Sequence, residues 1–572
     1  MTHPSKYIAV FFLSVLAVSV SAQKKKKTVV TKPVQAAPVQ VIKETPDTSA
    51  PKTVTITSAF KPSLKSAAKV NFIAATPVID SSKIPVVYNI PSQNLFFSYK
   101  PVSLKPLALN IDSNIVWEND QYIKVGAGNF SSYLGEVGFS FGDGVNSITN
   151  LRGNFITTTG HLPAQQASKL GIDVLSIFKT GESHEWNAHA YYKSNTQYLY
   201  GYQPATLPYT KDDLLQRFNT VGIEVGVQNK LANPYGIKYN PQVGFIRFAD
   251  NHDVSQNDLV IKLPLSKAFN KSYAFNLGFT ADMTSSRVTL IPNPVDTKND
   301  LYYVSPAFQL TIPNLKLNLG IQPSWSNKVF SALPEITAEA KLSEDLPISF
   351  EAGWIGYYHK NTYRSLSDIN PFINSSTPLT VANTKINEQY VGIKGNSGSH
   401  FTYGARVSLL KFNDQALFVN NTGDGKAFNV VYEPDMKAIR LHGELGYTMG
   451  EKISVLASMN FTQYNGLSVN EKAWGLLPFE TTGTLKWKLL KDLQLKADVF
   501  LWDGSFYKDR VTGLSGKLDP VADLNVGAEF TVLPRLNIWF QMNNMLNSAY
   551  QRWNQYPVLG FTVLGGVVYS FR

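Results

Sequence analysis

The final stretch of the chain, from Leu536 to Arg572, constrains the fold more than any other part of the sequence. In its first segment every second side chain is apolar, and the face so formed carries Leu536, Ile538, Phe540 and Met542. In its second segment the shared face carries Phe561, Val563, Val567, Tyr569 and Phe571. Aromatic residues that bracket an aliphatic band are typical of a strand that faces lipid. We therefore expect a membrane-embedded strand here rather than the covered strand of a soluble sheet.

Polar and apolar residues alternate in the same way through most of the chain from Tyr122 onward. For example, Gln494, Lys496 and Asp498 alternate with Leu493, Leu495, Ala497, Val499 and Leu501. Charges that recur on one face only, opposite an apolar face, fit a water-filled lumen better than a soluble sandwich. The expected lumen-facing charges are Glu335, Glu339, Lys341, Glu351, Arg406, Lys496, Asp498 and Glu529. We expect them to pair with one another or with an inserted N-terminal segment.

The connections between these strands alternate between short turns and longer loops. Short turns are expected at Gly142–Asn146, Thr180–His184, Asn229–Tyr235, Ser266–Lys271, Pro313–Asn314, Ser343–Asp345, Lys411–Asp414, Met449–Lys452, Lys491–Asp492 and Leu533–Pro534. The longest loop is expected from about His359 to Ser399. These turns join about 20 strands, and a first and a last strand bring the count to about 22. The sequence therefore predicts an all-β fold, a transmembrane antiparallel β-barrel in residues 122–572 with both termini in the periplasm.

The composition of the chain agrees with such a barrel. Hydrophobic residues make up only 44% of the sequence, whereas aromatic residues reach 12%. This balance is expected where one face of each strand is polar and the other meets lipid. The chain has no cysteine, which excludes disulfides and a lipid attached to cysteine. After the N-terminal region no run of about 18 apolar residues occurs, which excludes a spanning helix.

Residues 1–22 have the features of a signal peptide. Lys6 supplies the positive charge, Ile8 to Val20 is a short apolar run, and Val20, Ser21 and Ala22 precede the cleavage point. An exported chain with a strand pattern and no helical anchor is expected in the outer membrane of a Gram-negative bacterium. Its expected partners are the lipids of that membrane and the machinery that inserts barrels into it.

Residues 23–121 are rich in Lys, Pro, Ala, Thr and Ser. Residues 23–52 are expected to form a disordered periplasmic tether. In residues 53–121 apolar side chains recur between prolines, so this Pro/Lys-rich segment is expected to lie extended against another part of the molecule. A barrel of about 22 strands is too wide to be filled by its own wall side chains. We expect the segment Thr53–Ile111 to occupy the lumen as a makeshift plug, and the alternative occupant is the long loop His359–Ser399.

Two stretches resemble the TonB-dependent receptors of Bacteroidota. The segment from Asn543 to Tyr550 is similar to the one before the family's last strand, and the segment from Gln551 to Phe561 is similar to the one that leads into that strand. The resemblance implies a receptor barrel of this size. It also implies that a TonB-box-like stretch near the N-terminus is formed by Thr53, Val54, Thr55, Ile56 and Thr57. Family members carry a globular plug, and the N-terminal segment lacks the sequence pattern of one, so the chain looks like a plugless relative.

No catalytic residue, metal ligand or cofactor site is expected from the sequence. His161, His184, His189 and His442 lack the spacing of metal ligands, and no cysteine assists them. The segment that carries Tyr198, Tyr200, Tyr202 and Tyr209 is expected to be an extracellular aromatic loop. Such a loop stacks a sugar, docks a partner, or packs within its own loops.

Two function classes fit these features. One is a receptor- or transporter-like barrel that binds or passes a solute. The other is a non-transporting subunit of a larger outer-membrane complex for protein insertion, secretion or nutrient uptake, which binds other outer-membrane or periplasmic proteins. A subunit is expected to show polar docking patches that interrupt its lipid-facing strands. Neither class is an enzyme, and neither binds nucleic acid.

Overall fold

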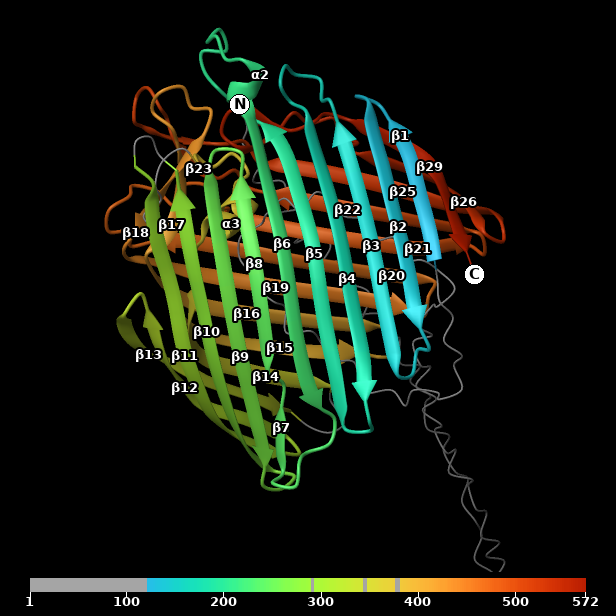
Figure 1. Cartoon of the computed structure of the whole chain (residues 1–572), viewed down its shortest axis with the longest axis vertical. Helices are drawn as coiled ribbons and strands as arrows, with labels where there is room; N and C mark the ends of the chain where they lie inside the picture. The colour runs from blue at the N-terminus through green and yellow to red at the C-terminus, as the bar shows by residue number, and fades with distance from the viewer. Residues whose placement is uncertain (1–120, 290–292, 343–346, 376–380, 572) are drawn as a thin grey trace, which may run out of the picture. The chain divides into compact units, whose positions relative to one another are not determined.

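The computed structural model describes residues 121–289, 293–342, 347–375 and 381–571. In this part of the chain, 22 antiparallel strands form a closed barrel, and each barrel strand pairs with the next one along the chain (Figure 1). The last strand, β29 (Thr562–Phe571), closes the barrel by pairing with the first, β1 (Gln121–Gly128). The predicted all-β barrel of about 22 strands is confirmed.

The other barrel strands are β2 (Ser132–Gly142), β3 (Ser147–Thr158), β4 (Ala167–Thr180), β5 (His184–Tyr198), β6 (Leu215–Asn229), β8 (Gln242–Asp250), β9 (Val254–Ala268), β10 (Tyr273–Val288), β11 (Val295–Ile312), β12 (Leu315–Ser326), β13 (Val329–Lys341), β14 (Ile348–His359), β15 (Thr384–Ser397), β16 (Phe401–Asn413), β19 (Met436–Met449), β20 (Ile453–Asn465), β21 (Phe479–Leu490), β22 (Leu493–Trp502), β25 (Val521–Leu533) and β26 (Leu536–Asn543). The connections contain short strands, namely β7 (Ile237–Tyr239), β17 (Gln415–Asn420), β18 (Phe428–Glu433), β23 (Phe506–Lys508), β24 (Ser515–Lys517), β27 (Gln551–Trp553) and β28 (Tyr556–Pro557). They also contain the helices α2 (Lys211–Leu214) and α3 (Tyr363–Ile369).

The outer face of the wall is apolar over most of its surface. On β16, Val407 and Leu409 are exposed, whereas Arg406, Ser408 and Leu410 are buried on the opposite face. Apolar surface left in water costs about 25 cal/mol per Å², so a wall of this kind is stable only where lipid or another apolar surface meets it. None of the described helices is long and apolar enough to cross a membrane.

The connections differ between the two ends of the barrel. At one end, called here the short-turn end, ten connections lie at 143–146, 181–183, 230–241, 269–272, 313–314, 342–347, 398–400, 450–452, 491–492 and 534–535. The other end, the long-loop end, carries the six longest connections, at 199–214, 360–383, 414–435, 466–478, 503–520 and 544–561. Gln121 and Phe571 are register partners at the short-turn end, so both ends of the barrel sequence lie there.

The predicted short turn at Lys411–Asp414 is wrong. β16 continues to Asn413 and ends at the long-loop end, and the turn that is needed lies at 398–400 instead. The predicted loop His359–Ser399 therefore contains a barrel strand, β15. The strand count is still correct, because the wrongly predicted turn at Lys411–Asp414 and the turn at 398–400 that was not predicted cancel in the count. β15 escaped detection because its first half has polar residues on both faces, among them Lys385, Asn387 and Glu388, and this removes the alternation that marks a strand.

The seam between β1 and β29 depends on glycine. Gly126 and Gly566 are register partners there. A Cβ atom at Gly566 would lie 1.9 Å from the backbone oxygen of Val125, and one at Gly126 would lie 2.2 Å from the ring of Trp539. Any side chain at these positions would force the two strands apart, so the close approach requires glycine.

Candidate functional site

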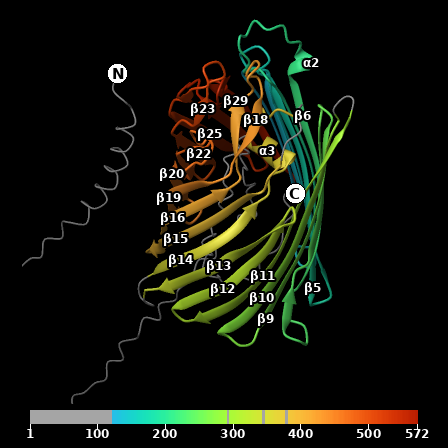
Figure 2. The ribbon, with the colours of Figure 1, turned by 90° about the vertical axis from the view of Figure 1, so that its left-hand side faces the viewer.

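A hydrophobic core built mainly from loops closes the long-loop end of the barrel. Its members are Phe218, Phe248, Val254 and Val288 of the wall; Tyr363, Leu366, Ile369 and Ile373 of the 360–383 loop; Ala416, Phe418 and Phe428 of β17 and β18; and Trp553 and Tyr556 of the 544–561 loop. We call this cluster the mouth core. Figure 2 shows α3 inside the ring of strands, towards the end that carries α2.

The mouth core is buried as deeply as a protein interior. Leu366 is completely buried, and Phe428 nearly so. The Phe372 ring, which packs against the core, stacks on Tyr556 with 3.6 Å between ring centroids, and Trp553 lies 5.2 Å from Phe418. Full burial of one such side chain contributes about 1.5–3 kcal/mol. The loops at this end thus have a common interior that joins them to the wall.

The helix α3 gives the 360–383 loop a defined shape. Its N-cap is Thr362, whose hydroxyl accepts a hydrogen bond from the Ser365 amide at 3.1 Å. The Thr362 amide donates in return to the Ser365 hydroxyl at 2.7 Å. This reciprocal cap satisfies two backbone donors that a helix N-terminus leaves unpaired. A helix this short is unstable alone, so its buried face, which includes Tyr363, Leu366 and Ile369, must supply the remaining stability.

Charged side chains bind the 360–383 loop to the inner face of the wall. Lys360 Nζ lies 2.5 Å from Asp282 Oδ1 on β10, and Arg364 Nε lies 3.4 Å from Asp258 Oδ2 on β9. Asp258 is almost fully buried and also accepts a hydrogen bond from Thr284 at 2.7 Å. Removing one member of a buried ion pair leaves the other charge uncompensated, so these pairs strongly disfavour displacement of the loop.

A network of buried amides provides a second attachment for the same loop. Asn299 of β11 donates to the Asn361 carbonyl at 2.7 Å and to the Asn383 side chain at 2.8 Å. Asn383 donates in turn to Ser326 at 2.9 Å. Both ends of the loop are therefore held by the wall, while Tyr363, Leu366, Ile369 and Ile373 lie in the mouth core.

Glu433, at the end of β18, binds the 466–478 loop. Its carboxylate accepts hydrogen bonds from the Ser468 amide and hydroxyl, both at 2.7 Å, from the Val469 amide at 3.0 Å and from the Asn470 amide at 2.7 Å. Burial by itself raises the pKa of this carboxyl, but the hydrogen bonds from Ser468 and Asn470 outweigh burial and lower the pKa to about 2. The ionised carboxylate of Glu433 therefore holds the 466–478 loop in place.

The aromatic residues of the predicted extracellular loop pack among the loops of the mouth. The Tyr200 ring lies 4.9 Å from that of Tyr556, and burial raises the pKa of Tyr200 to about 12. The Tyr202 and Tyr209 rings lie 5.1 Å apart, and the Tyr209 hydroxyl donates to Asp424. Tyr198 packs beside them in a small cluster around Leu199 and Leu214. Of the three roles considered for this segment, packing within its own loops is the one whose contacts the structure contains.

Some of the predicted lumen charges form a ladder on β13 to β16. Arg406 donates to Glu351 Oε1 at 2.8 Å through Nε and at 2.6 Å through Nη2. Lys394 lies 2.9 Å from Glu339 and 3.9 Å from Glu351, so it bridges the two carboxylates. The guanidinium of Arg406 also stacks 4.1 Å above the ring of Tyr390. The alternation of the sequence therefore brings three of its candidates together, with Lys394 as a fourth member that the sequence did not single out.

The remaining lumen candidates lie apart from this ladder. Lys496 pairs with Asp498 at 2.9 Å on the same strand, and Glu529 accepts a hydrogen bond from Asn537 at 2.6 Å. Glu335 lies on the inner face of β13, and one of its buried carboxylate oxygens has no hydrogen bond within the described part of the chain. Lys341 is exposed at the end of β13, near the short turns.

The other predicted residues belong to the last strand and to the N-terminal region. In β29, Val567 and Tyr569 are exposed on the outer face, while Leu564 and Val568 are buried on the opposite face. Val563 and Phe571 share the parity of Val567, and Phe561 precedes the strand. Thr53, Val54, Thr55, Ile56 and Thr57 lie outside the described residues, as does the segment Thr53–Ile111, so their roles stay predictions. Among the described residues no group of three or more acidic or histidine side chains is placed to hold a metal ion.

The sequence interpretation missed the mouth core. A signal for it exists, because the connections carry large apolar residues such as Leu366, Trp474 and Trp553 where loops in water are usually polar. Those residues are too scattered to show a period, so the sequence does not say what they pack against. Only the closure of the barrel brings the loops within reach of one another.

No family model matches the sequence, and no curated protein matches it. The fold, however, is similar to several solved structures. The FrpB iron transporter of Neisseria meningitidis (F5-1 variant) has a TM-score of 0.61 and 10% identity, over 79% of this chain and 82% of that one. The copper transporter OprC has a TM-score of 0.59 and 13% identity, over 79% and 80% of the chains. A variant of the ferric enterobactin receptor PfeA from Pseudomonas aeruginosa has a TM-score of 0.57 and 13% identity, over 79% and 80%.

These solved structures are TonB-dependent receptors. Identities of 10% to 13% show a common fold and nothing finer. The barrel resemblance found in the residues around Asn543 to Tyr550 therefore agrees with the fold of the described chain.

Proposed function

We propose that this chain is a gated outer-membrane barrel of the receptor or transporter type, which binds or passes a solute and is shut at rest by its own loops. The observation that carries the proposal is the mouth core, because it fills the long-loop end with side chains from three loops and four wall strands. The polar inner face, with its ladder of Glu339, Glu351, Lys394 and Arg406, suits a water-filled path behind this closure.

In this proposal the short-turn end and both termini face the periplasm, and the mouth faces outside. The chain works without a globular plug. The loops form the barrier on the outer side, and Thr53–Ile111 enters the lumen from the periplasmic side. Thr53 to Thr57 supply the contact through which TonB moves that segment. The solved iron and copper transporters support this type of barrel.

A second candidate function is a non-transporting subunit of a larger outer-membrane complex. The completeness of the mouth core favours it, because Leu366 and Phe428 are as buried as residues of a soluble protein's interior. A barrel that never opens can have loops that are packed together too stably to separate. The two candidates differ in one measurable property, which is whether removal of the closure yields a conducting pore.

The deciding experiment measures single-channel conductance in planar bilayers and entry of vancomycin into cells. The wild-type protein is expected to conduct little. Replacement of residues 362–382 by a short Gly-Ser linker is expected to raise conductance several-fold, because it removes α3 from the mouth core and leaves β14 and β15 intact. A barrel with a Gly-Ser insertion in the exposed 269–272 turn serves as the control and is expected to behave as wild type.

Deletion of Thr53–Ile111 in the same assay separates the two barriers. If only this deletion raises conductance, the N-terminal segment blocks the lumen and the loops are not the gate. If neither deletion, nor both together, raises the conductance of a correctly inserted barrel, the transporter proposal is wrong and the subunit function is supported.

A further inference from the structure

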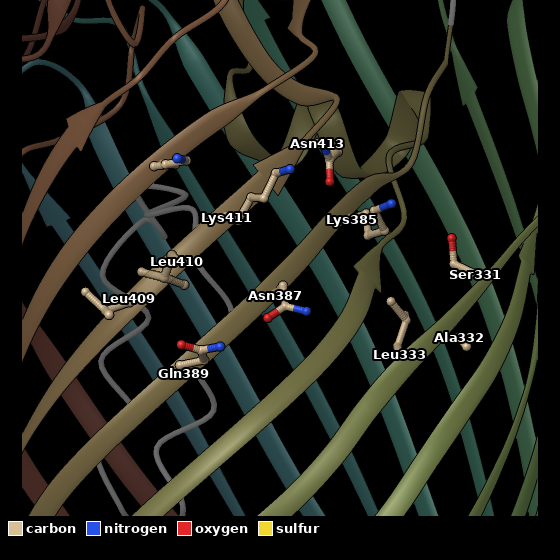
Figure 3. A pocket seen from close by; sticks show the side chains of 11 residues that line it. Ser331, Ala332, Leu333, Lys385, Asn387, Gln389, Leu409, Leu410, Lys411 and Asn413 are labelled. Carbon is tan, nitrogen blue, oxygen red and sulfur yellow. The ribbon is translucent and has the colours of Figure 1, made fainter.

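The outer wall is indented where the regular pairing of β13 with β14 ends. Their hydrogen-bonded register ends at Glu335 and Ile355, although both strands continue towards the long-loop end. A Cβ atom at Gly356 of β14 would lie 2.9 Å from the Cβ of Leu333, so the end of β13 lies against β14 instead of pairing beside it. A cavity of about 550 Å³ lies next to this step (Figure 3). We call it the wall groove.

One side of the wall groove is polar and basic. It is lined by Lys385, Asn387 and Gln389 of β15, Lys411 and Asn413 of β16, and Lys437 of β19. Residues 331–333 of β13 form the opposite side (Figure 3). The registers pair Asn387 with Lys411 and Lys411 with Lys437, so lysine and amide side chains form a continuous row across three strands.

This row lies on the membrane-facing side of the wall. Lys385, Asn387 and Gln389 share the parity of Val391 and Ile393, which are exposed apolar residues further along β15. Lys411 lies two residues after Leu409, and Lys437 lies two residues before Ile439. Leu409 and Ile439 are exposed, so both lysines share the outer face with them. Three cations and three amides therefore lie near the rim, directly above an aliphatic surface. Polar side chains on this face are costly in contact with acyl chains unless they have partners. Asn387 has one within the wall, because it accepts a hydrogen bond from Trp354 Nε1 at 2.8 Å.

The local charges leave part of the row available. At the rim Asp435 lies 3.3 Å from Lys411 and accepts a hydrogen bond from Asn413 at 2.6 Å, with both charged groups about half exposed. Asp414 is the other carboxylate near the row, beside Lys385. Within the part of the chain that the structure describes, Lys385 and Lys437 have no carboxylate within 4.0 Å. The three lysines of the row therefore outnumber the two carboxylates near it.

We propose that the wall groove binds the phosphorylated sugar headgroup of an outer-leaflet lipid. Lysines bind phosphate as point charges, and amide side chains both donate to and accept from sugar hydroxyls. The cavity has the volume of a small-molecule site, and the exposed Val391, Leu409 and Ile439 beneath it provide a surface for acyl chains. A ligand with charge above and hydrocarbon below matches the groove in both parts. The inference rests on the membrane location proposed above, and not on passage of a solute.

The test compares lipid retention by native mass spectrometry after reconstitution into vesicles. One set of vesicles contains phosphatidylethanolamine with lipid A, a diphosphorylated glucosamine disaccharide lipid, and the other contains the same lipid A without its phosphates. The variant K385Q/K411Q/K437Q is expected to retain lipid A at least about tenfold less than wild type, because each lysine near a membrane surface contributes to anionic lipid binding. The control K271Q/K452Q/K491Q removes three exposed lysines from the short turns and is expected to retain lipid A as wild type does.

Three outcomes overturn the proposal. One is equal retention of lipid A by the triple variant and the wild type, in barrels that show the same heat-modifiable mobility on gels. Another is equal retention of the phosphorylated and dephosphorylated lipids. The third is cross-linking of a photoreactive residue at position 437 to another protein in native membranes without any lipid retention. That result makes the groove a protein-docking surface and supports the subunit function. None of these outcomes depends on conductance, so the gating proposal is tested separately.

Discussion

The wall and the mouth of this barrel are specified in different ways. Each wall strand pairs with its neighbour in sequence. Most of these strands also alternate polar and apolar residues with a period of two, so their structure is set largely by residues that are close along the chain. The mouth core joins residues as far apart as Phe218 and Tyr556, and no repeating pattern connects them. The comparison predicts that the barrel can form without its closure. The wall can form by local rules, whereas the barrier depends on packing among distant loops.

The short-turn end shows the local rule in its simplest form. In the 143–146 turn, the Asp143 carboxylate accepts hydrogen bonds from the backbone amides of Val145, Asn146 and Ser147. These backbone hydrogen bonds lower the pKa of Asp143 well below its usual value. Most of the turn's polar groups are satisfied within it, and the Asn146 carbonyl accepts one hydrogen bond from the neighbouring β4, from the Lys179 amide at 2.7 Å. At the other end, the apolar side chains of each loop are buried only by packing against other loops and the wall.

The largest effect is expected at the seam of the wall. The substitution Gly566→Ala places a methyl group 1.9 Å from the Val125 oxygen, which is backbone and cannot rotate away. Strands β1 and β29 must then separate, so the yield of closed barrel is expected to fall to a small fraction of wild type. Heat-modifiable mobility on gels measures the closed fraction.

Gly135→Ala is the matched control for this substitution. Gly135 lies on β2, next to the seam strand β1, and a Cβ atom there would meet nothing within 4 Å. Its closed fraction is expected to equal that of wild type. If both variants close equally well, the seam does not depend on the close approach of Gly126 and Gly566.

A smaller effect, confined to the mouth, is expected for Leu366→Asp. The new carboxylate has no partner in the mouth core, and burying it costs more than about 4 kcal/mol, so the loop is expected to leave the core. The wall is expected to close normally. Limited proteolysis is expected to cut within 360–383 in the variant and not in wild type. In the control Val511→Asp, the side chain is 76% exposed and no new cleavage is expected. Loss of the closed barrel itself would show that wall and mouth are not separable.

The smallest effect is expected for Glu433→Gln. A neutral amide cannot accept all the hydrogen bonds from 468–470, so the local stability of that loop is expected to fall by about 2 kcal/mol. The folded carboxyl has a pKa of about 2 against an ordinary value of 4.5. The contribution of Glu433 to the stability of this loop is therefore complete above pH 4.5 and is lost as the pH falls towards 2. Hydrogen exchange of the Ser468 to Asn470 amides is expected to depend on pH in this way in wild type. The same dependence in the variant would exclude Glu433 as its source.

The sequence predicts most of the wall and little of the mouth. Alternation in segments such as Leu493 to Leu501 is a local property, and it survives in the structure as β22. The prediction failed at β15 because Lys385, Asn387 and Gln389 place polar groups where a lipid-facing strand is apolar. These same residues line the wall groove. The strand was missed for the reason that makes its surface a candidate binding site.

The mouth core was beyond prediction from one sequence for a physical reason. Leu366, Phe428 and Trp553 lie in connections whose course depends on the diameter of the barrel and on one another. Each of them is an apolar residue in a loop, but no periodic pattern shows what it packs against. The lumen charges could be predicted in part. The alternation of the sequence predicts that Glu351 and Arg406 face the lumen, whereas their contact depends on the register between β14, β15 and β16.

The order of the strands also determines how the barrel can be assembled. Every barrel pairing joins neighbours along the chain except that of β1 with β29, whose partners Gln121 and Phe571 lie at opposite ends of the barrel sequence. A growing sheet of this kind has two unpaired edges until the last strand arrives, and unpaired edges recruit other strands. Closure thus requires the first and the last strands of the barrel sequence to meet. An incomplete chain would remain an open sheet, competent to pair with a neighbour in place of itself.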